Sequence, residues 1–164
     1  MLFFIVLFRM VAESGERWQK VAFFMGEYNN KVDAKGRVII PSKFREKLGG
    51  EFVVTKGLDK CLNVYDRESW DKIQEKLAQM PILTADARTV RRMMVGSAIE
   101  ADTDSNGRVL LTAPLRNYAN IEKEATLIGN IDHIEIWSRS EWEKAQLIDA
   151  DEAAEKLYNS GIQL

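Results

Sequence analysis

The feature that most constrains the fold of this chain is an internal repeat. The sequence DAKGR at residues 33–37 returns as DSNGR at residues 104–108, an offset of 71 positions from Asp33 to Asp104. The match extends beyond the turns, with residues 38–40 over 109–111, 44–45 over 115–116 and, after a slip of one residue, 62–65 over 134–137. Such self-similarity indicates a duplicated structural unit. With two copies only, we expect a pseudo-twofold pair of units rather than a solenoid.

Each copy predicts the same order of elements: strand, turn, strand, short helix, strand, strand, helix. An acid in the first position of the turn and a glycine in the fourth favour a type I turn with a left-handed glycine, which joins two strands as a hairpin. In the first copy, Pro41 and Ser42 begin the short helix and Gly49 ends it. The predicted fold class is therefore α+β, built from two tandem units with short helices.

The last helix of each unit carries a marked start. In the second copy, Ser138 and Glu141 match a capping box, and Trp137 and Trp142 stand where a hydrophobic staple places its two residues. The corresponding residues of the first copy are Asp66, Tyr65 and Trp70. Trp70, Ile73 and Leu77 share one helix face, and a stripe of this kind belongs to the core, so we assign the aromatic residues no ligand role.

These patterns divide the chain into segments. They are a first unit at 25–71, connecting helices at 72–97, a second unit at 98–143 and an acidic C-terminal helix or tail at 144–164. We expect residues 1–24 to be a leader from an upstream start, outside the fold, with Met25 as the natural start. The apolar run at 1–8 is shorter than the ~20 residues of a spanning helix. The first basic residue, Arg9, follows this run, whereas a signal peptide places basic residues before it.

The composition argues against an enzyme or a metal protein. A single cysteine, Cys61, excludes an intramolecular disulfide and fits a reducing, cytoplasmic environment. A single histidine, His133, makes a multi-histidine metal site within one chain implausible. The two residues occupy equivalent positions of the two units, but we expect no catalytic pair. We find no phosphate-binding glycine loop and no Ser/His/Asp pattern, and predict no enzyme, no cofactor and no metal.

The first turn stands in a locally basic stretch, although the whole chain has a net charge of −2. Residues 27–47 hold six basic and three acidic side chains, whereas residues 98–117 hold two and three. A two-stranded ribbon fits the major groove of DNA, an arginine on it can bind guanine O6 and N7, and nearby lysines attract phosphates. The alternative is that Arg37 merely pairs with Asp33, an exposed ion pair worth at most about 1 kcal/mol.

Several stretches in this order closely resemble the bacterial MraZ family, from about Met25 to Trp142. They are GEYNNKVDAKGRVIIPSKFREKLG, GLDKCLNVYDRESW, DSNGRVLLTAPLRNYA and IEIWSRSEW. The resemblance implies AbrB-like units of the swapped-hairpin β-barrel type, two per chain. It also implies a transcriptional regulator, usually a repressor, that binds short promoter repeats of the division and cell-wall gene cluster as a ring-shaped homo-oligomer.

The D-x-x-x-R motif of that family falls on Asp33 and Arg37, and again on Asp104 and Arg108. The predicted DNA-binding residues are Arg37 for bases, Lys35, Lys31 and Lys43 for phosphates, Asp33 for the shape of the turn, and the second pair Arg108 and Asp104. Asn106 replaces Lys35 in the second turn, so we do not expect equal roles for the two turns.

The expected partners are double-stranded DNA with direct repeats and further copies of the same chain, whose combined contacts raise avidity. The expected location is the cytoplasm, in association with the nucleoid, with no membrane partner and no small-molecule substrate. Three alternatives stay open: an antitoxin-like module that binds its operator and a toxin, a ring that does not touch DNA, and, third, an enzyme.

Overall fold

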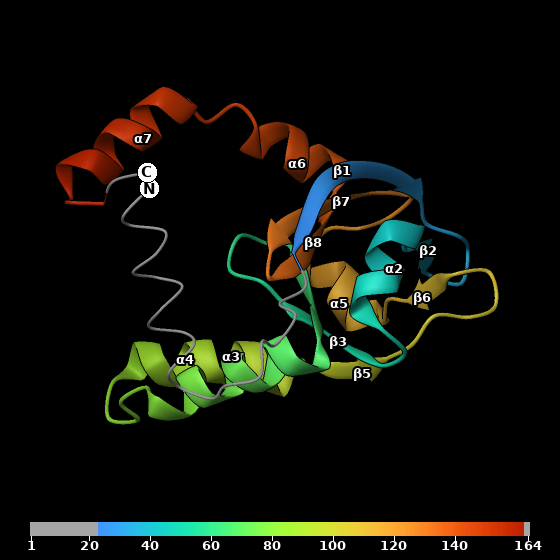
Figure 1. Cartoon of the computed structure of the whole chain (residues 1–164), viewed down its shortest axis with the longest axis horizontal. Coiled ribbons are helices and arrows are strands. Elements are labelled where there is room, and N and C mark those ends of the chain that lie inside the picture. Colours follow the sequence, from blue (N-terminus) through green and yellow to red (C-terminus); the bar gives the residue numbers. More distant parts are fainter. Residues whose placement is uncertain (1–22, 163–164) are drawn as a thin grey trace, which may run out of the picture.

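The computed structural model describes residues 23–162 and is an α+β structure in which helices surround an antiparallel sheet (Figure 1). The elements of the first unit are β1 (Phe24–Lys31), β2 (Arg37–Ile39), α2 (Ser42–Leu48), β3 (Phe52–Lys56), β4 (Leu62–Asp66) and α3 (Arg67–Gln79). Those that follow are α4 (Ala85–Gly96), β5 (Ile99–Ala101), β6 (Arg108–Leu110), α5 (Ala113–Tyr118), β7 (Glu124–Ile131), β8 (His133–Ser138), α6 (Arg139–Ala145) and α7 (Ala150–Asn159). The order of elements predicted for each copy is confirmed.

The two units exchange strands. The larger sheet has the order β1-β7-β8-β4-β3-β5, and β2 pairs with β6 in a separate two-stranded ribbon, with all pairs antiparallel. Strand β1 of the first unit pairs with β7 of the second, and β5 of the second pairs with β3 of the first. Equivalent strands also pair with each other, as β2 does with β6 and β4 with β8. Neither unit therefore completes its sheets alone, and Figure 1 shows β1 beside β7.

The expected hairpin across the first turn is reduced to a single bridge between Val32 and Val38. This corrects the prediction that the two strands flanking each turn form the ribbon. The strands separate because β1 pairs with β7 along its whole length, from Phe24 to Lys31, while β2 turns away to pair with β6. The ribbon is therefore made between the units rather than within one.

Both units contribute to one hydrophobic core. Phe44 of α2, Leu62 of β4, Leu127 of β7 and Ile136 of β8 are all buried in it. Phe24 also lies in this core, 2% exposed, with its ring edge-on to Phe44 at a centroid distance of 5.8 Å. The predicted leader, residues 1–24, therefore includes one residue of the core, Phe24, and the fold begins at or before that residue. Residues 1–22 of that predicted leader lie outside the described residues.

The predicted helix starts are present. The Ser138 side chain accepts a hydrogen bond from the Glu141 amide at 3.2 Å, and the rings of Trp137 and Trp142 lie 5.6 Å apart. In the first unit the Asp66 carboxylate accepts from the Ser69 amide at 2.7 Å. These caps fix the direction in which α3 and α6 leave the sheet.

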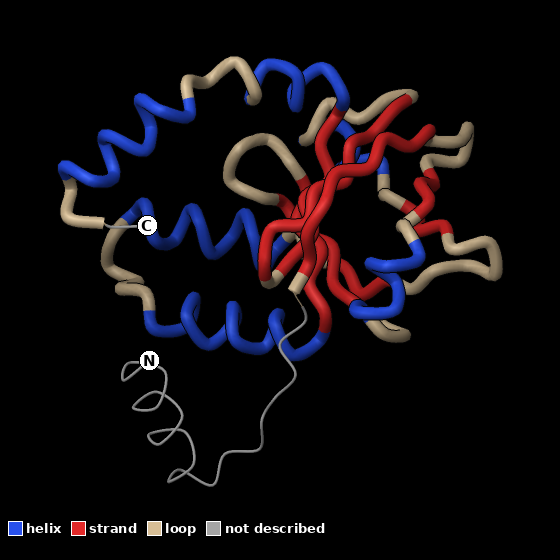
Figure 2. Tube along the Cα trace, turned by 45° about the horizontal axis from the view of Figure 1, so that its top comes forward, coloured by secondary structure: helices blue, strands red, loops and turns tan. Residues whose placement is uncertain are grey.

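The helices α3 and α4 extend side by side away from the sheet, and α7 projects on another side of the molecule (Figures 1 and 2). Helix α4 is attached to β3 through the buried Met94, whose carbonyl accepts a hydrogen bond from the Thr55 hydroxyl. Helix α7 has no buried residue. Within residues 23–162, no helix combines the length and apolar character that crossing a membrane requires.

Candidate nucleic-acid interface

The first turn is built around the carboxylate of Asp33. Its Oδ1 accepts hydrogen bonds from the backbone amides of Lys35 and Arg37, both at 2.9 Å. The Gly36 amide donates to the Asp33 carbonyl at 2.9 Å, and Gly36 has a φ of +81°, in the left-handed region that favours glycine. An acid and a glycine at these two positions are therefore what this turn requires.

The second turn repeats this geometry. Asp104 accepts from the amides of Asn106 and Arg108 at 2.9 and 3.0 Å, and Gly107 has a φ of +73°. The pKa of Asp104 is lowered, most of all by the hydrogen bond from the Arg108 amide. The pKa of Asp33 is lowered in the same way by the amide of its own arginine. Both carboxylates are thus held in their charged form by the turns that they shape.

The two turns lie against each other and form a cluster of four charges. The Nε atom of Arg37 donates to Asp33 Oδ2 at 2.8 Å, and Arg108 Nη2 lies 2.8 Å from Asp104 Oδ2. Two longer contacts cross between the units, Arg37 Nη1 to Asp104 Oδ2 at 3.5 Å and Arg108 Nη1 to Asp33 Oδ2 at 3.7 Å. The pairing of Arg37 with Asp33 that the sequence left as an alternative is therefore present, within a larger network.

The outer face of the β2–β6 ribbon combines cationic and aliphatic side chains. In the antiparallel register Arg37 lies opposite Leu110, and Ile39 lies opposite Arg108. Ile39 and Leu110 are about half exposed. Val38 and Val109, which pair with each other in the middle of the ribbon, are fully buried. Strand alternation therefore gives the ribbon one face in the core and one face that presents two arginines to solvent.

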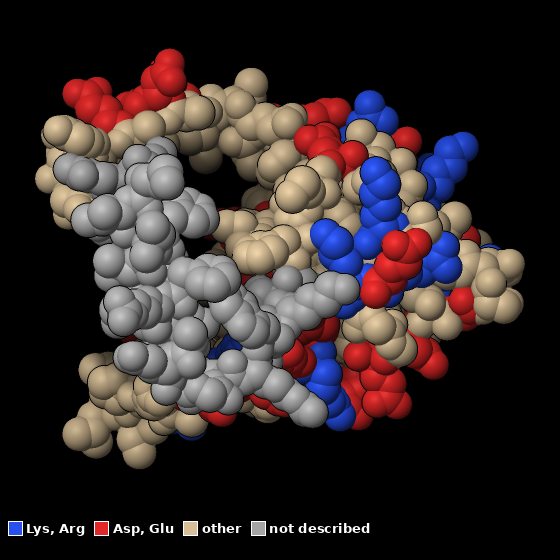
Figure 3. Space-filling model, viewed as in Figure 1, with Lys and Arg blue, Asp and Glu red and all other residues tan. Residues whose placement is uncertain are grey.

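The three predicted phosphate-binding lysines surround this ribbon without joining the cluster. Lys35 is exposed at the tip of the first turn, Lys31 at the end of β1 and Lys43 in the first turn of α2. None of the three side chains makes an ion pair or hydrogen bond with another described residue, and Figure 3 shows basic side chains gathered over α2 and the neighbouring part of β1. Two arginines and two aspartates cancel in charge, so the lysines supply the net positive charge here.

Two arginines that the sequence analysis did not assign to the site brace the turns. Arg45 of the first unit packs against Gly107 of the second, and Arg116 of the second packs against Gly36 of the first. Their guanidinium groups donate to the carbonyls of Ile40 at 3.0 Å and Leu111 at 2.7 Å. Their equivalent positions in the repeat, each after a buried apolar residue, were the signal that could have identified them.

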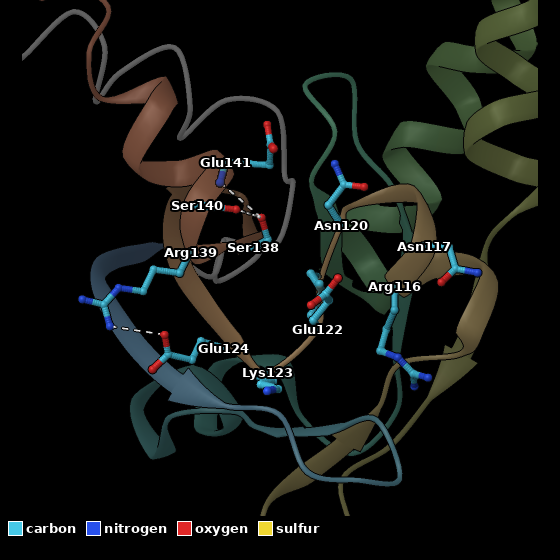
Figure 4. Close-up of a pocket in the computed structure, with 11 residues that line it drawn as sticks. Arg116, Asn117, Asn120, Glu122, Lys123, Glu124, Ser138, Arg139, Ser140 and Glu141 are labelled. Atoms are coloured by element: carbon cyan, nitrogen blue, oxygen red, sulfur yellow. Dashed lines mark hydrogen bonds and ion pairs between the residues drawn. The ribbon is translucent and has the colours of Figure 1, made fainter.

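A broad depression of about 600 Å³ lies between α5, the loop after it and the start of α6 (Figure 4). Arg139 lies at one edge of it and its guanidinium points toward Glu124, with Nη1 and Oε2 3.4 Å apart. Its charged lining residues are Arg116, Lys123, Arg139, Glu122, Glu124 and Glu141. Cationic and anionic side chains balance, and the walls are polar, unlike the mostly apolar pockets that hold small molecules.

Cys61 and His133 do not form a catalytic pair. The Cys61 thiol donates to Asn63 Oδ1 at 3.7 Å, and its burial raises its pKa to about 12. The His133 ring lies beside the Tyr65 ring and contacts the carboxylates of Asp132 and Glu135. The hydrogen bonds and ring contacts of Cys61 and His133 are thus with different neighbours. The part of the chain from 23 to 162 also contains no cluster of three or more His, Cys, Asp or Glu residues able to hold a metal ion.

Two adjacent segments, 23–93 and 94–158, each match the family model described as "MraZ protein, putative antitoxin-like". The chain belongs to the MraZ family. The double match corresponds to the duplicated units that exchange strands in the fold. It also confirms the resemblance to MraZ that was based on the two turns and the motifs around them.

Relatives with the name "Transcriptional regulator MraZ" align with most of this chain. The protein from Caldanaerobacter subterraneus subsp. tengcongensis is 46% identical over 84% of this chain and 99% of its own length. The MraZ of Alkaliphilus oremlandii is 48% identical over 85% of this chain and 99% of its own. The MraZ of a Thermoanaerobacter species is 50% identical over 84% and 99%.

Proposed function

We propose that this chain is a sequence-specific transcriptional regulator that binds double-stranded DNA through the β2–β6 ribbon and its two turns. Membership of the MraZ family and the names of its relatives support a role in transcription regulation. The observation that carries the DNA-binding role is the pairing of both D-x-x-x-R turns on one exposed ribbon, surrounded by lysines that have no ion-pair partner among residues 23–162.

Arg37 is the base-reading residue of this mechanism. A two-stranded ribbon fits the major groove, and a guanidinium there can donate two hydrogen bonds to guanine. Asp33 already holds the Nε atom of Arg37 at 2.8 Å, so the plane of the guanidinium is fixed before DNA arrives. Because the side chain is already ordered, less conformational entropy is lost when it binds DNA.

The remaining predicted residues divide the other tasks. Lys31, Lys35 and Lys43 bind phosphates, which supplies affinity without sequence preference. Arg108 and Asp104 form a second reading position opposite the first. It contributes less, because Asn106 stands where the first turn has Lys35.

Promoter occlusion by a ring of such chains is the proposed mode of action. Several ribbons on neighbouring promoter repeats convert weak single contacts into strong combined binding, which suits a chain of net charge −2. The proposed target is the promoter of the division and cell-wall gene cluster, and the effect is repression by a nucleoid-associated cytoplasmic protein that is not an enzyme. The exchanged strands support a swapped-hairpin barrel built from the proposed units 25–71 and 98–143.

An antitoxin-like role is the second candidate, because the matched family model carries that term in its description. In that case the chain would bind both an operator and a small toxin. Purification of the native protein with a stoichiometric small partner would support this role. Purification without one, together with operator binding, would favour the regulator.

Fluorescence anisotropy tests the proposal directly. A labelled duplex from the region upstream of the gene is compared with a scrambled duplex of equal composition, at low and at about physiological salt. We expect tighter binding to the upstream duplex. Arg37→Ala should lose about 1–3 kcal/mol of this preference, the discrimination that one bidentate contact provides.

Arg67→Ala is the matched control for that experiment. Arg67 is an exposed arginine at the start of α3 that pairs with Glu100 at 2.6 Å, away from the turns. Its loss should leave the preference unchanged. Equal binding of the wild-type protein to both duplexes would reject the proposed function, and no binding to either duplex would favour a ring that does not touch DNA.

A further inference from the structure

Helix α7 has an apolar stripe on which no other described part of the chain is packed. Residues 150, 153, 154, 157 and 158 recur at the spacing of one helix face and read Ala, Ala, Ala, Leu and Tyr. None of them is buried, and Tyr158 is 67% exposed. The two residues that lead into the helix, Leu147 and Ile148, are 84% and 70% exposed. Exposed apolar residues that adjoin one another in this way form the kind of surface on which partners dock.

One edge of this stripe is acidic. Asp151 and Glu155 are one helical turn apart, next to Tyr158, and neither makes an ion pair with a described residue. Glu152 pairs with Lys156 at 2.6 Å toward the opposite face. The surface that α7 offers is thus apolar with two unpaired carboxylates along its edge, and Figure 3 shows the acidic cluster at this end of the molecule.

Helix α4 offers a surface of the opposite charge. A shallow groove of about 450 Å³ is lined by Ile82, Arg88, Arg91, Arg92, Val95 and Gly96. Ile82 and Val95 are 60% and 44% exposed and form its apolar floor. Arg88 donates to the carbonyls of the loop before α4, but Arg91 and Arg92 have no acidic partner among the described residues.

We propose that α7 of one chain docks in the α4 groove of a neighbouring copy, with its leucine and tyrosine on the apolar floor and its acids against Arg91 and Arg92. The two surfaces are complementary in both charge and apolar content. The occupant is therefore a second copy of this chain, and the contact deepens the proposed function because it names the joint that closes the proposed ring.

The short linker before α7 favours a contact between chains over one within a chain. Only Leu147 and Ile148 separate the C-cap of α6 from the N-cap of α7, so the two caps lie no more than about 11 Å apart. Helix α6 packs on β7 and β8, whereas α4 packs on β3 at the other side of the sheet. In Figure 1, α7 lies well apart from α4 of the same chain. A head-to-tail contact between different surfaces generates a ring when its rotation closes.

Cysteine cross-linking of the full chain tests this contact. In a Val95→Cys/Leu157→Cys variant, mild oxidation should give a ladder of disulfide-linked multimers on a non-reducing gel. The native Cys61 is buried with a raised pKa, so it should not react. A Ser105→Cys/Leu157→Cys variant, with one cysteine at the exposed tip of the second turn, is the matched control. On the same gel it should run as single chains, because its two cysteines do not meet in the proposed contact. Linkage within single chains, dimers only, or equal ladders in the control would overturn the proposal.

Charge reversal provides a second, independent test by analytical ultracentrifugation. Arg91→Glu/Arg92→Glu and Asp151→Lys/Glu155→Lys should each reduce the assembly to smaller species, and a chain carrying all four changes should regain the assembled mass. Lys76→Glu, on an exposed position of α3, is the control and should not dissociate it. Unchanged mass in both double variants would overturn the docking contact.

The two proposals can fail separately. If the double variants keep the wild-type mass and the wild-type protein still prefers its upstream duplex, the docking contact is wrong and the regulator stands. If the charge exchange behaves as expected but the wild-type protein shows no preference for any duplex, the contact stands and the regulator is wrong.

Discussion

The guanidinium group of Arg116 fills the space beside Gly36 that a larger residue would need. A Cβ atom on Gly36 would lie 2.5 Å from Arg116 Cζ, and one on Gly107 would lie 2.6 Å from Arg45 Cζ. Each turn is thus held by an arginine of the other unit, in addition to its own aspartate. Because the backbone amides of Ile40 and Leu111 also donate to the carbonyls of the opposite glycines, at 2.9 and 3.0 Å, the two turns form one structural feature.

Gly36→Ala should therefore destabilise the protein more than a left-handed backbone alone explains. The strain of φ +81° costs an alanine about 1–2 kcal/mol, and displacing Arg116 adds the loss of its bond to the Leu111 carbonyl. The control is Gly36→Ala in an Arg116→Ala background, where the guanidinium is absent and only the backbone strain remains. Urea unfolding followed by circular dichroism gives both losses. Equal losses would show that Arg116 does not brace the turn.

The repeat made much of this fold predictable. Once the two D-x-x-G-R turns are aligned, strand patterns and helix caps that are weak in one copy are supported by the other. The starts of α3 and α6 at Asp66 and Ser138 follow from side chains that bond their own backbone nearby. Features of this kind depend on residues a few positions apart, which a sequence displays directly.

The exchange of strands between the units could not be predicted from the sequence. A turn pattern predicts a hairpin, but the partner of β1 is β7, almost a hundred residues away, and its register depends on which apolar faces meet in the shared core. The cross-unit contacts of Arg37 and of Arg45 follow from that exchange. The residues that form the two turns were therefore predictable, while the contacts between the turns were not.

Phe24→Ala should cost about 3–5 kcal/mol, the usual loss for a phenylalanine removed from a core. Its ring is 2% exposed and packs edge-on against Phe44. Phe23→Ala provides a neighbouring control, because Phe23 is 55% exposed, and should cost little. Thermal unfolding by calorimetry measures both. Similar melting temperatures for the two variants would contradict the place of Phe24 in the core.

The two turn aspartates should make stability depend on acid pH. Their pKa values are lowered in the folded protein, so the stabilisation is present above the unfolded value of about 3.9 and is lost as the pH falls through the folded pKa below it. Asp33→Asn/Asp104→Asn should be less stable than wild type at pH 7 and approach it near pH 2. Urea midpoints at a series of pH values test this, with Asp71→Asn on an exposed position of α3 as control. A constant gap between variant and wild type would contradict it.

The difference between Lys35 and Asn106 should appear in the salt dependence of DNA binding. Each phosphate contact releases counterions and contributes a slope of about −0.9 in a plot of log K against log salt. Lys35→Ala should flatten the slope by about that amount for upstream and scrambled duplexes alike, because phosphate contacts are blind to sequence. Asn106→Lys should steepen it, since the turns share one geometry and the second tip is also exposed. Lys76→Ala on α3 should leave the slope unchanged. If Asn106→Lys left the slope of log K against log salt unchanged, the second turn would not contact the DNA backbone. Groove contact would then be limited to the first unit.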